Sequence, residues 1–433
     1  MKVVHVCMQH YGGAGTAAYR LHRALLGVGV ESSMCVLNRR GDDSSIKVAV
    51  PQGGGMHALP GENGAVTFVS DEWIRAGRRW RSMLDDYPAR PGNLEIFTDV
   101  HSGLSPYDLP GVAEADVVHL HWVAGMIDWT ADLGPLVDKP VVWTLHDMNA
   151  FTGGCHYSAG CERWREGCGA CPALGSSAQD DVSRRAWDVR HRAYADFDPV
   201  VVTPSRWLGR LAAQSPLFAG RRVEVIPNGL DTEQFRPWPA DAVRSGVGLD
   251  PDSFVILFGA ASVHNHRKGF RQMVRTLEAL KTECGVENAV LVIFGQWSGG
   301  EPDLPYPVME FGYMDDEMKL AAVYSLADVF LLPSLEDNLP SVALESLACG
   351  TPVAAFDVGG MGDMIVHRET GWLAQPYDAL DLAKGLVWAR AMRHARKGLA
   401  ARCRATVLEH FTAQAQARAH AALYRSILMH APA

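Results

Sequence analysis

Residues 329–360 read VFLLPSLEDNLPSVALESLACGTPVAAFDVGG, and this stretch decides the fold class. The apolar run at 329–332 has the length of a buried strand, and a polar loop follows it. Residues 341–349 show helical periodicity, and a second apolar run begins at residue 352. A strand, a helix and a strand in this order predict parallel strands joined by a helical crossover.

The same alternation runs along the rest of the chain. Further apolar strand candidates lie at 2–8, 33–37, 117–120, 141–145, 200–203, 223–226, 254–259 and 290–294. A polar, proline-rich segment at 237–251 separates two such series, and 433 residues exceed what one core usually organises. The sequence therefore predicts an α/β protein with two doubly wound, Rossmann-like domains.

We expect an N-terminal domain at 1–238, a C-terminal domain at 239–408 and a closing helix at 409–433. The glycine and proline content of residues 51–110 predicts an irregular insertion there. Inside it, residues 73–84 form a basic amphipathic helix that suits either an anionic membrane surface or docking on the domain.

Composition narrows the class of partner. Lys and Arg total 40 against 49 Asp and Glu, giving a net charge of −9, so nucleic acid is not expected as a partner. The apolar start is too short for a secretory signal, and no apolar run has the roughly 18 residues of a membrane span. We therefore expect a cytoplasmic protein, with peripheral membrane contact through residues 73–84 left open.

Two loops suit a phosphorylated ligand. The GGAG run at 12–15 precedes a helix, so its backbone N–H groups could approach an anion, although a tight turn without a ligand is an equal alternative. Arg267 and Lys268 stand before another helix, where two cations and free N–H groups together suit a diphosphate. A solvated basic turn is the alternative for that pair.

The polar loop after residue 332 and its helix supply further groups. Glu345 is the candidate for holding two ribose hydroxyl groups, because an ionised carboxylate only accepts hydrogen bonds. Asp337 could accept from sugar hydroxyls, and Asn338 and Leu339 offer backbone N–H donors to the same ligand. Helix capping is a competing role for Asp337 or Ser341.

The chain resembles the GT-B fold retaining glycosyltransferases of family 4, in particular the bacterial exopolysaccharide type, over nearly its whole length. The resemblance is carried by GGAG at 12–15, TLHD at 144–147, TPS at 203–205, IPNGLD at 226–231, RKGF at 267–270 and LEDNLPSVALESLACGTPV at 335–353. It implies two domains facing a central cleft, with a UDP- or GDP-sugar donor held mainly by the second. It also implies a glycan or lipid-linked acceptor and no obligatory catalytic metal.

The resemblance also implies roles for single residues. Lys268 matches the lysine that contacts the diphosphate, and Glu345 the glutamate that holds the ribose. Asp337 matches the first acidic position, where the family usually has glutamate. Glu336 precedes it here, so either carboxylate could reach the sugar.

Two further positions come from the resemblance. His146 matches the cleft histidine near the transferred sugar, which makes it a catalytic candidate with Lys268 and Asp337, and Gly13 matches the loop that faces the donor. The family's arginine five residues before the lysine is Val263 here, which moves diphosphate recognition partly onto Arg267.

Two other functions fit this fold. One is a nucleotide-sugar epimerase, and the other is an inactive nucleotide-sugar-binding scaffold, suggested by Val263 and the shifted acidic residue.

Four of the nine cysteines cluster in the run CHYSAGCERWREGCGACP. Cys155, Cys161, Cys168 and Cys171 end in a C-x-x-C pair and suit a structural zinc ion, with His156 as a substitute ligand. Disulfides or free thiols are the alternatives. His119 and His121 alternate on the run VVHLHW and could face the cleft, or lie buried with hydrogen-bond partners.

Overall fold

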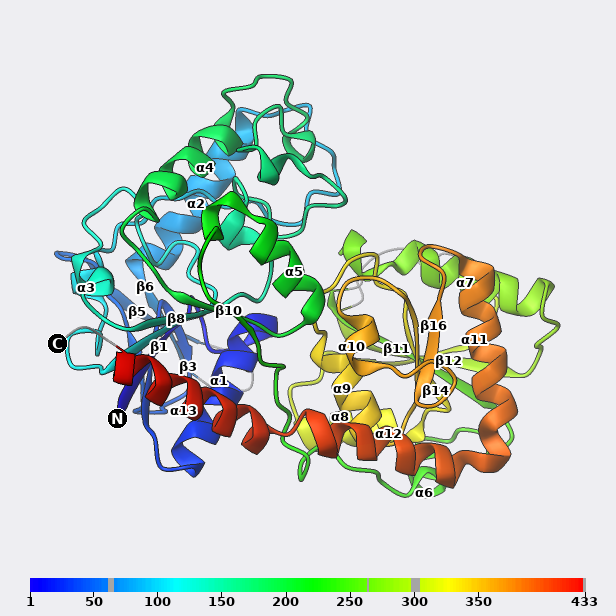
Figure 1. Cartoon of the computed structure of the whole chain (residues 1–433). Coiled ribbons are helices and arrows are strands. Elements are labelled where there is room, and N and C mark those ends of the chain that lie inside the picture. Colours follow the sequence, from blue (N-terminus) through cyan, green and yellow to red (C-terminus); the bar gives the residue numbers. More distant parts are fainter. Residues whose placement is uncertain (61–65, 263–264, 297–303, 431–433) are drawn as a thin grey trace. The chain divides into compact units, whose positions relative to one another are not determined.

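The structure is a computed structural model that describes residues 1–60, 66–262, 265–296 and 304–430 (Figure 1). It divides into two compact units, one formed by Met1–Gly229 with Gln414–Ala433 and the other by Leu230–Ala413. The domain boundary was predicted between residues 238 and 239, whereas the two units divide after Gly229. The C-terminal segment predicted from residue 409 rejoins the first unit at Gln414.

The first unit is built on a seven-stranded sheet in which every paired strand is parallel. Its order is β10 (Val223–Val225), β9 (Val200–Thr203), β8 (Val141–Thr144), β7 (Val117–Leu120), β1 (Lys2–Val6), β2 (Glu31–Val36) and β4 (Ile46–Val48). The helices are α1 (Gly12–Gly27), α2 (Asp71–Asp85), α3 (Gly134–Val137), α4 (Val182–Ala193), α5 (Arg206–Gln214) and α13 (Ala413–His430). Leu21 and Leu25 of α1 and Tyr424 of α13 share one core with Val3 of β1. Both ends of the chain therefore contribute to the same unit.

The insertion is more regular than its composition predicts, so the expectation of an irregular segment is wrong for its first part. β5 (Met56–Pro60) and β6 (Val66–Ser70) pair antiparallel, and β6 also pairs with β3 (Asn38–Arg40). The partner β3 lies outside the insertion. Backbone hydrogen bonds to this distant segment order the strands, although the local glycine and proline content predicts an irregular segment.

Helix α2 docks on this unit. Ser70 caps it by accepting from the Glu72 N–H, Ala76 is buried, and Trp80 packs against the core. The Arg79 guanidinium lies 2.8 Å from the Glu72 carboxylate. These contacts agree with the docked alternative for residues 73–84.

The second unit contains a six-stranded sheet, also parallel throughout. Its order is β13 (Val308–Gly312), β12 (Ala289–Gln296), β11 (Phe254–Ser262), β14 (Val329–Leu332), β15 (Val353–Phe356) and β16 (Gly371–Ala374). The helices are α6 (Ala240–Gly246), α7 (Phe270–Thr282), α8 (Glu317–Leu326), α9 (Ser341–Ala348), α10 (Met361–Met364), α11 (Ala379–Ala391) and α12 (Arg396–His410). Along β11, Val255 and Leu257 face one core while Phe254 and Ile256 face the other. Burial on both faces explains why these strands read as continuous apolar runs. The predicted pair of parallel, doubly wound sheets is confirmed.

A buried ion cluster secures the start of β14. The Asp328 carboxylate lies 2.9 Å from the Arg244 guanidinium and 3.2 Å from that of Arg396. It also accepts the N–H of Val255, which joins the cluster to β11. Within the described part of the chain, no helix is both long and apolar enough to cross a bilayer.

Candidate functional site

The second unit has its topological switch point between β11 and β14. From β11 the chain proceeds outward to β12 and β13, and it then returns to β14, β15 and β16 on the other side. In open α/β sheets, ligands bind beyond the carboxyl ends of the strands at such a point. The loops that leave β11 and β14 carry Arg267 with Lys268 and Glu336 with Asp337, so the sequence candidates meet where the topology predicts a ligand.

Backbone and side-chain hydrogen bonds hold these two loops together. The Leu335 N–H donates to the Arg267 carbonyl at 2.8 Å, and the Arg267 guanidinium donates to the Glu336 carbonyl at 3.0 Å. Since the two loops leave neighbouring strands, these bonds bring Arg267 and Lys268 beside the loop that carries Glu336 and Asp337.

Two glycines allow this close approach. Gly269 has φ +75°, and a Cβ there would lie 1.8 Å from the Pro333 carbonyl oxygen. Gly359 has φ +58°, and its Cβ would lie 1.8 Å from the carbonyl oxygen of Asp337. Both positions combine a left-handed backbone with contact too close for any side chain. Glycine at each is therefore a condition for the site's geometry.

An ion cluster occupies the centre of the group. The Lys268 Nζ lies 2.7 Å from Asp337 Oδ2, and an Arg267 Nη lies 3.1 Å from the same oxygen. Burial raises the pKa of Asp337, but the charges of Lys268 and Arg267 outweigh it and hold the pKa below its usual value. Two cations thus share one buried carboxylate. Lys268 retains 24% exposure, so a ligand could reach its ammonium group.

Glu345 lies in α9 and is 4% exposed. The Tyr324 hydroxyl, on α8, donates to Glu345 Oε2 at 3.1 Å, and the Tyr324 ring packs edge-on against Phe294. Tyr324 therefore orients the carboxylate. Sequence analysis missed this residue, although a tyrosine in an apolar helix signals a buried hydroxyl that needs a partner.

The loop that was predicted to offer backbone N–H donors to a ligand is buried. Asn338 and Leu339 are both buried, and the Asn338 N–H donates to Asp337 Oδ1 at 3.1 Å. In the first unit, Gly13 is exposed in the first turn of α1, whose N-cap Tyr11 makes no side-chain capping bond. Val263 lies outside the described residues.

A row of histidines marks the switch point of the first unit, between β1 and β7. His121 Nδ1 lies 3.1 Å from His146 Nε2, and His121 Nε2 lies 2.9 Å from His5 Nδ1. His119 contacts the Tyr424 hydroxyl at 2.6 Å. Burial lowers the pKa of His146 to about 4 against the opposing charge of Asp147, so His146 is neutral near pH 7. His119 and His121 are buried and hydrogen-bonded.

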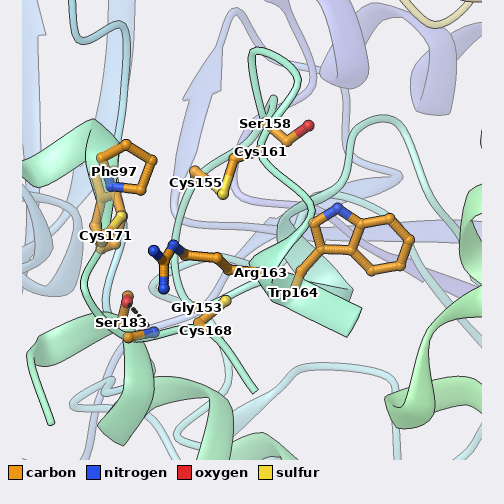
Figure 2. Close-up of a pocket in the computed structure, with 12 residues that line it drawn as sticks. Phe97, Gly153, Cys155, Ser158, Cys161, Arg163, Trp164, Cys168, Cys171 and Ser183 are labelled. Atoms are coloured by element: carbon orange, nitrogen blue, oxygen red, sulfur yellow. Dashed lines mark hydrogen bonds between the residues drawn. The ribbon is translucent and has the colours of Figure 1, made fainter. Parts of the chain in front are cut away.

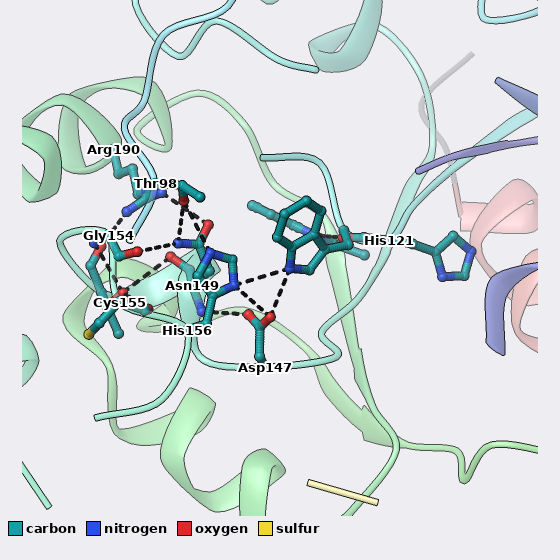
Figure 3. A network of polar contacts seen from close by, with 11 residues as sticks. Thr98, His121, Asp147, Asn149, Gly154, Cys155, His156 and Arg190 are labelled. Atoms are coloured by element: carbon teal, nitrogen blue, oxygen red, sulfur yellow. Dashed lines mark hydrogen bonds and ion pairs between the residues drawn. The ribbon is translucent and has the colours of Figure 1, made fainter. Parts of the chain in front are cut away.

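The carboxylate beside His146 is fixed by a second network (Figure 3). His156 Nδ1 lies 2.7 Å from Asp147 Oδ2, and the Trp122 indole N–H donates to the same oxygen at 2.9 Å. The Met148 N–H donates to the His156 carbonyl at 2.9 Å. The loop that carries His146 is thus tied to the start of the cysteine-rich segment.

Family comparisons agree with this geometry. The family model described as "Glycosyltransferase Family 4" matches residues 11–234, and that described as "Glycosyl transferases group 1" matches residues 253–390. The chain belongs to glycosyltransferase family 4. His119, His121 and His146 lie in the first matched range, and the Lys268–Asp337 cluster lies in the second.

Curated relatives of this family 4 chain are glycosyltransferases by name. D-inositol 3-phosphate glycosyltransferase 2 of Catenulispora acidiphila is 26% identical over 88% of this chain and 83% of that protein. The putative colanic acid biosynthesis glycosyl transferase WcaC of Escherichia coli is 27% identical over 60% of this chain and 63% of that protein. The D-inositol 3-phosphate glycosyltransferase of Pseudarthrobacter chlorophenolicus is 28% identical, and the match spans only 60% of its length.

Solved structures share the fold of the family 4 chain. Sucrose-phosphate synthase from Thermosynechococcus elongatus aligns over all of both chains with a TM-score of 0.66 and 19% identity. Anabaena HepE in complex with UDP aligns over 98% of this chain and 100% of its own, with a TM-score of 0.60 and 14% identity. The fold class is that of the GT-B glycosyltransferases.

Proposed function

We propose that the chain is a retaining glycosyltransferase that moves a sugar from a UDP- or GDP-sugar to a glycan or lipid-linked saccharide in polysaccharide biosynthesis. The observation that carries the proposal is the Arg267–Lys268–Asp337 cluster at the switch point of the second unit. HepE, whose fold is similar, has been solved with UDP and with UDP-glucose, and WcaC is named for colanic acid biosynthesis.

Charge stabilisation is the main catalytic contribution in this proposal. The acceptor oxygen forms a bond to the anomeric carbon as the bond from that carbon to the diphosphate breaks, on the same face of the sugar. The acceptor proton passes to the departing phosphate oxygen. Lys268 and Arg267 meet the charge that develops on the diphosphate, and Asp337 keeps both cations in place before the donor arrives.

Other groups bind and orient the donor. Glu345, held by Tyr324, accepts from the ribose hydroxyls. Either Glu336, which is half-buried, or Asp337, which is buried beside two cations, accepts from the sugar hydroxyls. In the first unit, the family resemblance assigns a neutral His146 to recognition of the transferred sugar and Gly13 to recognition of the donor.

Peripheral membrane contact belongs to this proposal through a lipid-linked acceptor. Arg75, Arg78 and Arg81 are exposed on α2, whose other face is docked. Their cationic side chains suit an anionic lipid surface. Flotation with vesicles of anionic and of neutral lipid tests this contact, and equal recovery with both would contradict it.

A donor panel tests the proposed function. Thermal unfolding is measured with UDP-, GDP- and ADP-sugars, because a ligand that binds the folded state raises its apparent stability. The sugar that shifts the transition is then incubated with and without saccharide acceptors, and nucleoside diphosphate release is followed. Acceptor-dependent release with the retained anomer is expected.

The same experiment separates the alternatives. Conversion of the donor to an epimer without acceptor would replace the transferase with the epimerase. Donor binding without turnover for any acceptor in a library would support the inactive nucleotide-sugar-binding scaffold. The shift of the first acidic position, with Asp337 where the family usually has glutamate, is the feature that favours this alternative.

A further inference from the structure

The four clustered cysteines line one small cavity in the first unit (Figure 2). The segment runs through the short helices η4 (Arg163–Arg165) and η5 (Pro172–Leu174) with no longer regular element. The cavity has a volume of about 20 Å³, which is room for one water molecule or ion. Residues separated along an irregular loop thus converge on a space of atomic size.

The backbone of this loop adopts left-handed conformations at or near the cysteines. Among the described residues, five non-glycine residues have positive φ, and three of them lie here, namely Ala159 at +48°, Cys168 at +61° and Ala170 at +43°. Left-handed backbone costs about 1–2 kcal/mol for a residue with a side chain. Such conformations persist where surrounding structure enforces them, and they cluster at functional or ligand-clamping sites.

Backbone N–H groups point at two of the sulfurs. The backbone N–H groups of Leu174 and Ala173 donate toward the Cys171 sulfur, and that of Gly153 donates toward the Cys168 sulfur. Hydrogen bonds of this kind accompany thiolate ligands, whose negative charge they stabilise.

The four cysteines suit a zinc ion better than the group of three buried histidines in the same unit does. His5, His119 and His121 have ring nitrogens within 4.8 Å of one another, but His5 Nδ1 lies against His121 Nε2 and both His119 nitrogens lie against hydroxyl groups. His5 Nε2 is buried without a hydrogen-bond partner. Four thiolates in a closed set are the ligands of structural zinc. The four sulfurs do not form a group at that 4.8 Å spacing among the described residues, so an ion would draw them inward.

We propose that Cys155, Cys161, Cys168 and Cys171 bind one structural Zn²⁺. The ion closes the loop, and Cys155 passes the constraint to the neighbouring His156, which pairs with Asp147 beside His146. The Thr152 hydroxyl also donates to the Cys155 carbonyl at 2.6 Å, which anchors the same end of the loop. The ion has no open coordination position, so its role is to position the His146 loop rather than to take part in transfer.

Metal analysis tests the site. The full chain is purified under reducing conditions from cells grown with added zinc, and zinc is measured by mass spectrometry. The wild type and a Cys284→Ser control should each carry one zinc per chain, and a Cys168→Ser/Cys171→Ser variant should carry none. Cys284 is a matched control because it is a half-buried cysteine of the second unit.

Further variants keep the test decisive if the double variant does not fold. A Cys171→His variant should keep one metal ion, and on replacement with Co²⁺ its sulfur-to-cobalt charge-transfer absorption should be weaker than that of the wild type. A His5→Gln variant should keep its zinc. Zinc-free wild type with disulfides or free thiols in the loop, or zinc lost with His5→Gln but not with the cysteine changes, would overturn the proposal.

Discussion

Lys268→Ala separates a catalytic role from a structural one at the proposed donor site. The ammonium group lies 2.7 Å from Asp337 and is 24% exposed, while Arg267 pairs with the same carboxylate at 3.1 Å. Because Arg267 still neutralises Asp337 in the variant, the free energy of unfolding should fall by no more than about 1 kcal/mol.

The expected loss in turnover is much larger than this. Removing one donor that meets transition-state charge typically lowers kcat by about 100- to 1,000-fold, or roughly 3–4 kcal/mol. Nucleoside diphosphate release is measured with saturating donor, alongside donor affinity by calorimetry. Lys384→Ala, an exposed lysine of α11, is the matched control for the removal of a positive charge from the second unit.

Turnover of Lys268→Ala close to that of Lys384→Ala would refute the assigned role of Lys268. A parallel collapse of thermal stability would show instead that the ion cluster chiefly holds the two loops together. Lys268→Arg keeps the charge and should recover part of the lost turnover.

Three further changes follow from the packing and charges. Gly269→Ala forces a Cβ to within 1.8 Å of the Pro333 carbonyl in a left-handed backbone, so unfolding experiments should show a loss of about 2–4 kcal/mol and weaker donor binding; unchanged stability would contradict the close approach. Asp328→Asn leaves Arg244 buried without its counter-charge and should cost about 3–5 kcal/mol by denaturant titration, whereas a change below 1 kcal/mol would show that the pair is not buried in solution. Burial lowers the pKa of His420 to about 4 from 6.5, so the folded state binds fewer protons than the unfolded state between those values. The stability that neutral His420 contributes above pH 6.5 should therefore fall by up to about 3 kcal/mol as the pH drops to 4. Because His146 titrates in the same range, urea titrations compare the wild type with His420→Gln, and an identical pH dependence of the two would show that His420 is solvated.

The burial of a strand explains whether it could be predicted from the sequence. Parallel strands buried on both faces, such as β11 and β14, are short apolar runs and are recognisable from local sequence. β13 was not predicted. It lies at the sheet edge with Val308 and Glu310 exposed, so its sequence is not a continuous apolar run. β5 and β6 were not predicted because β6 pairs with β3, outside the insertion, and β5 in turn pairs with β6.

The sequence by itself determined the fold class, the two sheets and the identity of the charged residues in loops after strands. Only the tertiary structure decided which of those residues meet. Lys268 and Asp337 are 69 positions apart, and His119 and Tyr424 are 305 positions apart, yet each pair is in direct contact. Local patterns report how a segment buries its own apolar side chains, whereas the order of strands in a sheet decides which loop ends become neighbours, and that order depends on contacts distant in the chain.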